Sequence, residues 1–237
     1  MGFLQMLGLA VLPGLGILIG TLISEKKNLS DRVSAAALHW IAGTMLAVVG
    51  VEILPEVLKA QPSWPILIAV LIGGFLAIGS DRLIDRFTSE NGKWTILFAV
   101  AVDMFADGIT IGVSANISPN FALLVVLGLF IGDTPEGLIN TSSFKKQDTS
   151  RKFRVLVAVL LGFLCLAGAV TSYWLTRNQS DLVKYLFLAL TTGMYIQAAV
   201  EDLIERSHAK TGKNTLNQSL LIVGFTVYMA GSLFLKQ

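Results

Sequence analysis

Long apolar segments, each of about 20 residues, recur along the whole chain and are separated by short polar stretches. A helix needs about 20 residues to cross roughly 30 Å of hydrocarbon at about 1.5 Å per residue, so this pattern predicts transmembrane helices. We place eight spans at residues 3–23, 33–58, 64–84, 94–117, 119–144, 153–175, 182–204 and 216–235. Because the connections are short, residues 1–237 are expected to form a single all-α transmembrane domain.

The composition excludes the soluble classes of protein. Charged residues make up 14% of the chain, against about 25% in an ordinary soluble domain, and 54% of the residues are hydrophobic. A single cysteine, Cys165, excludes an intrachain disulfide framework. The chain also lacks the polar bias of a disordered protein and the basic face of a nucleic-acid binder. We therefore expect a multi-pass integral protein of the plasma membrane or the bacterial inner membrane.

The distribution of basic residues predicts the orientation in the membrane. Of the 18 lysines and arginines, all but four flank the spans on one side. The four on the other side are Lys59, Arg177, Lys184 and Lys236. Cytoplasmic loops carry the excess of basic residues, so both termini are expected outside and the loop at residues 145–154 in the cytoplasm.

Acidic residues, in contrast, lie inside the spans. There are seven of them: Glu52, Asp103, Asp107, Asp133, Glu136, Glu201 and Asp202. An ionised side chain at the bilayer centre costs at least about 2.5–3.5 kcal/mol, and no basic residue accompanies these acids in the apolar segments. Each acid is therefore expected to be protonated, to face water or to receive a cation.

The fourth and fifth spans hold the densest group of acids. Asp103 and Asp107 are four residues apart, and Asp133 and Glu136 are three apart, so each pair shares one helix face. The loop between the two spans is very short, which makes them antiparallel neighbours with both pairs near the middle of the membrane. Four carboxylates there would repel one another unless protons or a metal ion neutralised them. We predict an ion or proton site.

Other residues could support such a site. Pro135, between the acids of the fifth span, removes a helical hydrogen bond and frees a carbonyl oxygen. Met45 and Met104 are interpreted as core residues that can serve as peripheral soft ligands. His39 and His208 are interpreted as interfacial residues. Since the chain lacks a phosphate-binding glycine loop, a Ser/His/Asp set and Cys/His zinc spacing, an enzyme is not expected.

The second and seventh spans are similar in sequence when offset by 149 residues. Residues 43–56 align with residues 192–205, and Met, Val, Glu, Leu and Glu coincide. The two spans cross the membrane in opposite directions, so the match predicts the inverted repeat of an alternating-access transporter. The acids at the span ends are candidates for the entrance and exit of a cation pathway: Glu52, Glu56, Glu201, Asp202 and Glu205.

These stretches resemble the ZIP family of divalent-metal transporters. Residues 133–137 match its Pro-Glu-Gly motif in the fifth span, and residues 103–108 stand where its fourth span carries His-Asn-x-Pro-Glu-Gly. Residues 42–47 and 54–56 are similar to its second span, and 193–195 to its seventh. The resemblance implies eight spans, both termini outside, spans 1–3 inverted against spans 6–8, and metal bound by spans 4 and 5.

The departures from the family pattern bear on the cargo. Carried over by position, the metal site is Asp103, Asp107 and Glu136, with Asp133 beside it and Met45 near. Asp103 replaces the family's histidine, and the motif also departs at three further positions: Met104, Ala106 and Asp107. An all-oxygen set suits Mn²⁺, Mg²⁺ or Fe²⁺ better than Zn²⁺, although carboxylates do bind zinc. The metal is expected as substrate, with no resident cofactor.

Three function classes follow. The first is a divergent ZIP-like transporter that moves a divalent cation toward the cytoplasm. The second is a non-transporting sensor or partner subunit with a degenerate metal site, which the changes at Met104 and Ala106 favour. The third, an intramembrane aspartyl protease, lacks the Gly-x-Gly-Asp sequence, since the nearest match is residues 130–133. The expected partners are the lipid bilayer and divalent metal ions, not nucleic acid, and a homodimer is left open.

Overall fold

All eight predicted spans are confirmed as helices. The computed structural model describes residues 1–27, 29–88 and 92–236. Eight helical spans in these ranges are long and apolar enough to cross a membrane. They are α1 (Phe3–Lys26), α2 (Asp31–Ala47) with η1 (Val48–Ile53) and α3 (Leu54–Val57), α4 (Trp64–Phe87), α5 (Lys93–Ala115), α6 (Pro119–Lys145), α7 (Arg151–Thr176), α8 (Asp181–Gln197) with η2 (Ala198–Leu203) and α9 (Ile204–Thr211), and α10 (Thr215–Leu235). The chain is a multi-pass integral membrane protein.

Serine residues begin three of the spans. The hydroxyl oxygens of Ser30, Ser118 and Ser150 each accept a hydrogen bond from the backbone N–H three residues later. Such a cap satisfies one of the free N–H groups at a helix start. Because Ser118 caps α6 only three residues after α5 ends at Ala115, the two helices are joined by a tight turn.

Large apolar side chains cover the outer faces of the bundle. Phe75 on α4 and Phe234 on α10 are 68% and 76% exposed, and both helices carry many other exposed leucines, isoleucines and valines. A soluble monomer does not expose apolar surface on this scale. The polar side chains instead lie inside, where Thr44, Asp107 and Thr192 are at most 1% exposed. An apolar outside around a partly polar inside is typical of a helix bundle that is embedded in a membrane.

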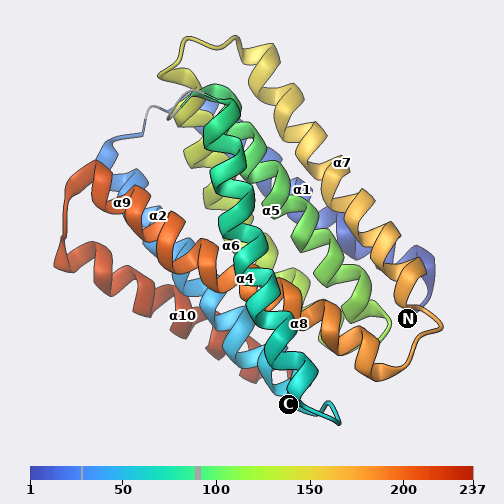
Figure 1. The fold of residues 1–237 in the computed structure, drawn as a ribbon. Helices are drawn as coiled ribbons and strands as arrows, with labels where there is room; N and C mark the ends of the chain where they lie inside the picture. Colours follow the sequence, from blue (N-terminus) through green and yellow to red (C-terminus); the bar gives the residue numbers. More distant parts are fainter. Residues whose placement is uncertain (28, 89–91, 237) are drawn as a thin grey trace.

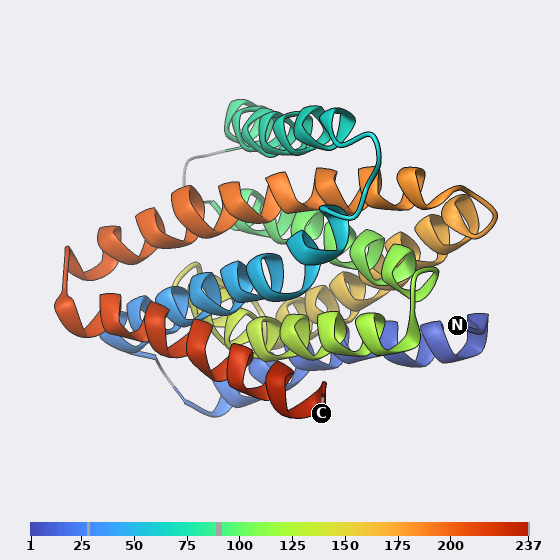
Figure 2. The ribbon, with the colours of Figure 1, turned by 90° about the horizontal axis from the view of Figure 1, so that it is seen from below.

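The spans pack as two halves related by inversion. The α1 helix packs along α6 as α7 packs along α5, and α4 packs along α8 as α10 packs along α2 (Figures 1 and 2). Exchanging spans 1–3 with spans 6–8, and span 4 with span 5, converts each contact into its counterpart. Consecutive spans alternate in direction, so the two halves have opposite topology. The expected inverted arrangement of three, two and three helices is confirmed.

Close glycine contacts locate the symmetry axis. A Cβ atom on Gly14 of α1 would lie 2.7 Å from the Cα of Gly162 on α7, and one on Gly162 would lie 3.2 Å from the Cα of Gly14. The same offset of 148 residues relates Gly20, packed on α6, to Gly168, packed on α5. Small residues allow such backbone contacts between membrane helices. The axis therefore passes between Gly14 and Gly162.

The π-helical segments correct the alignment of the repeat by one residue. The segments Val48–Ile53 and Ala198–Leu203 interrupt the second and seventh spans at positions exactly 150 residues apart. At this offset Glu52 corresponds to Asp202, whereas the sequence match pairs it with Glu201. Identities among apolar residues do not discriminate between neighbouring offsets, but the shared backbone distortion does. Single π-helical turns occur often at functional sites.

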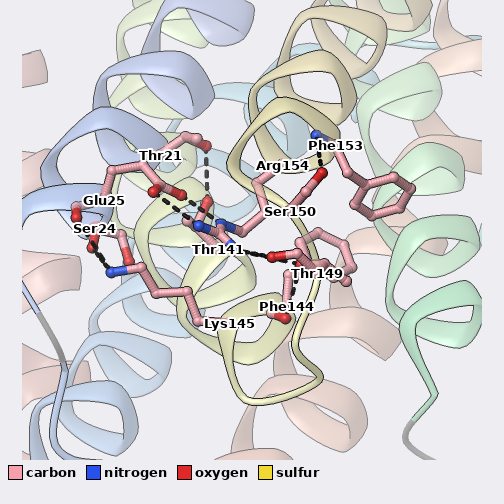
Figure 3. Close-up of polar contacts among 10 residues, drawn as sticks. All are labelled: Thr21, Ser24, Glu25, Thr141, Phe144, Lys145, Thr149, Ser150, Phe153 and Arg154. Carbon is pink, nitrogen blue, oxygen red and sulfur yellow. Dashed lines mark hydrogen bonds and ion pairs between the residues drawn. The ribbon is translucent and has the colours of Figure 1, made fainter.

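Both chain termini lie toward one end of the bundle, and the α6–α7 loop lies at the other (Figure 1). We call these ends the termini side and the loop side. On the loop side, Arg154 donates to both carboxylate oxygens of Glu25, at 2.5 and 2.9 Å, and Lys145 Nζ donates to the carbonyl of Ser24 at 2.5 Å (Figure 3). Arg154 and Lys145 thus hold the C-terminal end of α1 against α6 and α7.

Candidate metal site

The carboxylates of Asp107 and Glu136 occupy equivalent positions in the two halves. Each directly precedes a glycine that touches a neighbouring helix. A Cβ on Gly108 would lie 2.0 Å from a carbonyl oxygen of α7, and one on Gly137 would lie 2.2 Å from a carbonyl oxygen of α1. These contacts are symmetry counterparts, so the inversion maps Asp107 onto Glu136. The two acids therefore approach the centre of the bundle from α5 and α6 in the same way.

Asp107 is fixed by a tyrosine from the seventh span. Its side chain is 1% exposed, and its Oδ1 accepts a hydrogen bond of 2.7 Å from the hydroxyl of Tyr195. The hydroxyl of Thr110 lies 2.9 Å from the same tyrosine oxygen. A charge-assisted hydrogen bond of this length partly replaces the solvation that a buried carboxylate loses. Sequence reasoning did not select Tyr195, because the contact joins residues 88 positions apart.

Glu136 begins a polar chain that leads toward the loop side. Asn140 Nδ2 donates to Glu136 Oε1 at 3.3 Å, and Arg206 Nη2 donates to Asn140 Oδ1 at 3.5 Å. Arg206 also donates to Asp202 at 3.1 Å. The chain links a mid-bundle carboxylate on α6 to the π-helical segment η2. Arg206 was not selected from the sequence, where it reads as one of several basic residues near a span end.

A cavity next to Glu136 is large enough to hold water or an ion. It leaves about 60 Å³ of free space between α2, α4, α5, α6 and η2. Its polar lining includes Asp103, Glu136, Asp202 and Arg206, and Met45 contributes a thioether. A second hollow on the loop side shares Asp202 and Arg206 with it and adds Glu205. The two hollows form a polar route from the middle of the bundle to the loop side.

The four predicted ligands are placed differently with respect to this cavity. Asp103 and Glu136 line it, whereas Asp107 lies behind it against Tyr195. Asp133 is 4% exposed, and its Oδ2 has no hydrogen-bond partner among the described residues. In the ranges that the structure describes, no three His, Cys, Asp or Glu side chains are close enough to hold a metal ion together. A shared shell of Asp103, Asp107, Asp133 and Glu136 stays a prediction.

The two predicted methionine ligands also differ. Met45 lines the cavity, while Met104 is fully buried in the apolar core and does not line it. The position of Met104 fits its interpretation as a core residue. Met194, from the seventh span, lines the cavity beside Met45.

The expected absence of cationic partners for the acids is wrong at two positions. Lys236 Nζ lies 3.0 Å from Glu52, which also accepts a hydrogen bond from Ser232, and Arg206 pairs with Asp202. Both cations come from the ends of spans: Arg206 reaches along its own helix to Asp202, and Lys236 reaches from the end of α10 across to Glu52 in η1. Glu52 is 4% exposed, so its carboxylate is closed off by α10 on the termini side.

The other acids predicted at the entrance and exit of the pathway are more exposed than Glu52. Glu56 pairs with Lys59 at 2.7 Å, and this hydrogen bond raises the pKa of Lys59 above its ordinary value. Glu201 and Glu205 on the loop side are exposed. Among the predicted entrance and exit acids, Glu52 is therefore buried and paired, whereas Glu201 and Glu205 on the loop side are accessible.

Comparison with known proteins identifies the family. A model of the ZIP zinc transporter family matches residues 79–231, from the end of α4 into α10, and includes all four acids of α5 and α6. No curated protein matches the chain. The family match covers more than half of the chain and agrees with the inverted eight-span fold. The chain belongs to the ZIP family of zinc transporters, which are metal transporters and not enzymes.

Proposed function

We propose that this protein carries a divalent metal cation toward the cytoplasm through a carboxylate site between α5 and α6. The observation that carries the proposal is the equivalence of Asp107 and Glu136 across the inverted halves. A ligand from each half lets the same ion be held whichever side is open, as alternating access requires. Asp103 and Asp133 complete the proposed ligand set, with Met45 beside it.

The route to the loop side supports release in that direction. The cavity at Asp103 and Glu136 shares Asp202 and Arg206 with the hollow that reaches Glu205, and the carboxylates outnumber this arginine, which favours cations over anions. On the termini side, the Glu52 carboxylate is paired with Lys236 and buried. This arrangement corresponds to a transporter open toward the cytoplasm, if the basic loops face the cytoplasm as the positive-inside rule requires.

The ligand chemistry favours hard or intermediate cations. The four proposed ligands are carboxylates, and the cavity at Asp103 and Glu136 contains no imidazole among the residues that line it in the described structure. Oxygen-only sites suit Mn²⁺, Fe²⁺ and Mg²⁺ better than sites with nitrogen or sulfur ligands do. We therefore place Mn²⁺, Fe²⁺ and Mg²⁺ ahead of Zn²⁺ as the cargo.

The test is metal flux into proteoliposomes that contain the purified protein. Asp107→Asn and Glu136→Gln keep the size of each side chain and remove its charge, so each should lower Mn²⁺ and Fe²⁺ flux at least about tenfold. Asp148→Asn is the matched control, because Asp148 lies in the α6–α7 loop with φ of 53°, a conformation that asparagine also adopts. Flux of every divalent ion unchanged in both site variants would refute the proposal.

A sensor or partner subunit is the second candidate function. It is favoured by the full burial of Met104 in the core, at a position where the family carries a polar residue. Such a protein would bind metal in equilibrium dialysis and show no flux above that of empty liposomes. In that case Asp107→Asn would abolish metal binding, and the flux would be at the background level in both the original protein and the variant.

A further inference from the structure

The two histidines of the chain lie together on the loop side. His39 on α2 and His208 on α9 have ring centroids 5.6 Å apart, with an interplanar angle of 56°. His39 is 2% exposed, and His208 lies within helix α9 near its end. The sequence could not show the pairing, because it joins the second and seventh spans.

The hydrogen bonds of His39 assign its proton. Ser207 Oγ lies 2.8 Å from His39 Nδ1 and donates to the carbonyl oxygen of Ala35 at 2.9 Å, and the same carbonyl lies 3.2 Å from Nδ1. With the serine hydrogen directed at that carbonyl, His39 Nδ1 carries the ring hydrogen and donates it to Ser207 or Ala35. In the neutral ring the lone pair then belongs to Nε2. Metal-binding histidines are commonly oriented in this way, with the other ring N–H bound to a backbone carbonyl.

His208 provides the second nitrogen. Its Nε2 is buried and has no hydrogen-bond partner among the residues that the structure describes. A buried polar atom without a partner is uncommon and costs free energy, so such an atom points to a missing ligand or solvent molecule. A cation held between the two rings would satisfy it.

We propose that His39 and His208 form a second metal site, which takes a divalent cation of intermediate softness such as Zn²⁺. With Zn–N bonds of about 2.0–2.1 Å and ring nitrogens roughly 1.2 Å from each centroid, two imidazoles on a tetrahedral ion have centroids about 5.3 Å apart. The observed separation is 5.6 Å. Water completes the shell, since no third His, Cys, Asp or Glu joins these two in the described ranges.

The site is separate from the proposed transport site in both place and chemistry. Neither histidine lines the cavity at Glu136, and imidazole nitrogens replace carboxylate oxygens as ligands. The bridged helices α2 and α9 come from opposite halves of the inverted repeat. An ion that binds both helices stabilises the conformation in which they are packed, in proportion to its occupancy.

Zinc binding is measured on a variant that lacks the transport ligands. The Asp107→Asn/Glu136→Gln protein, purified with its tag removed, is titrated with Zn²⁺ by calorimetry, and bound metal is counted by elemental analysis. We expect one zinc ion per chain. Adding His208→Gln or His39→Asn should weaken its binding at least about tenfold, because each removes one nitrogen ligand.

The two histidine substitutions also control for folding. In His39→Asn the amide Nδ2 can donate to Ala35 in place of the ring Nδ1, so the helix contact is kept while Nε2 is lost. If the variant without transport ligands binds no zinc, or binds it equally well after both histidines are replaced, the second site does not exist. Either result leaves the proposed transport function untouched, because that function is measured as flux in the protein with both histidines.

Discussion

Tyr195 holds Asp107 by a hydrogen bond that a bound metal ion would have to displace. The tyrosine donates at 2.7 Å to Oδ1, one of the two oxygens that could coordinate the ion. A hydrogen bond to a charged group contributes about 1.5–3 kcal/mol, and an ion that replaced the tyrosine at Oδ1 would leave this contribution to the metal-free state alone. In the proposed site, Tyr195 would therefore influence how readily the ion binds and leaves.

Replacing Tyr195 by phenylalanine should therefore tighten metal binding. We expect Tyr195→Phe to lower the dissociation constant for Mn²⁺ at least about fivefold, because the metal-free state loses its hydrogen bond while the metal-bound state does not. Calorimetric titration of the purified protein measures this change. Thr192→Val, also on α8, is the control, since Thr192 bonds its own helix at Leu188. Weaker binding in Tyr195→Phe would instead make the tyrosine a ligand.

The buried carboxylates of α5 and α6 could be identified from the sequence, but their partners could not. Acids in an apolar span are rare, so Asp107 and Glu136 are conspicuous in the sequence. Tyr195, Arg206 and Lys236 are ordinary residues in their own spans, and only the packing of distant helices brings them to the acids. Lys236, for example, pairs with an acid in the second span from the far end of the chain.

At the scale of elements, the length of the apolar segments predicted every span, whereas the π-helical segments within two of the spans were not predictable. The segment η1 has the sequence VVGVEI and η2 has the sequence AAVEDL, and neither proline nor glycine occurs in both of them. A π-helical turn inserts one extra residue into a helix, which is a choice of hydrogen-bond partner that tertiary packing decides. The sequence alignment of the repeat missed its correct offset for the same reason.

The Glu25–Arg154 pair gives a prediction about the α1–α7 contact. Both side chains are 9% exposed, and the guanidinium bonds the carboxylate through two nitrogens. Removing one partner of a closely bonded ion pair destabilises the fold, because the remaining charge loses its hydrogen-bonded counterion. Arg154→Met should therefore lower the unfolding temperature of the protein in nanodiscs clearly, as followed by circular dichroism.

A double variant distinguishes the pair from general packing. Glu25→Gln/Arg154→Met leaves no unpaired charge, so it should recover much of the stability lost in Arg154→Met. Lys146→Met is a control that removes an exposed ion pair with Asp31 and should change stability little. Equal losses in the single and double variants would show that the arginine acts through its packing alone.

For the whole molecule, the polar route to the loop side predicts one-sided accessibility. Ala99 lines both hollows of this route, while Val49 is 3% exposed on the closed termini side. The native Cys165 is fully buried, so a new thiol would be the reactive one. In Ala99→Cys a membrane-impermeant maleimide should label the protein from the cytoplasmic face of inverted vesicles.

The matched variant is Val49→Cys, which should stay unlabelled from either face in the same conformation. Labelling is followed by the mass of the intact protein. If Ala99→Cys reacted only from the extracellular face of right-side-out cells, the assigned orientation would be reversed. Equal labelling of both variants would mean that the closed termini side does not persist in a membrane.

The crossing of α1 and α7 at Gly14 and Gly162 has a mechanical consequence. In an inverted-repeat transporter, the outward-open state is obtained by exchanging the conformations of the two halves, and this operation maps the Gly14–Gly162 contact onto itself. If the proposed transport proceeds by such an exchange, this crossing is the contact that stays in place, and there the two backbones meet without side chains between them. A bulkier residue at either glycine should slow the exchange in both directions alike and leave the balance between the two states unchanged.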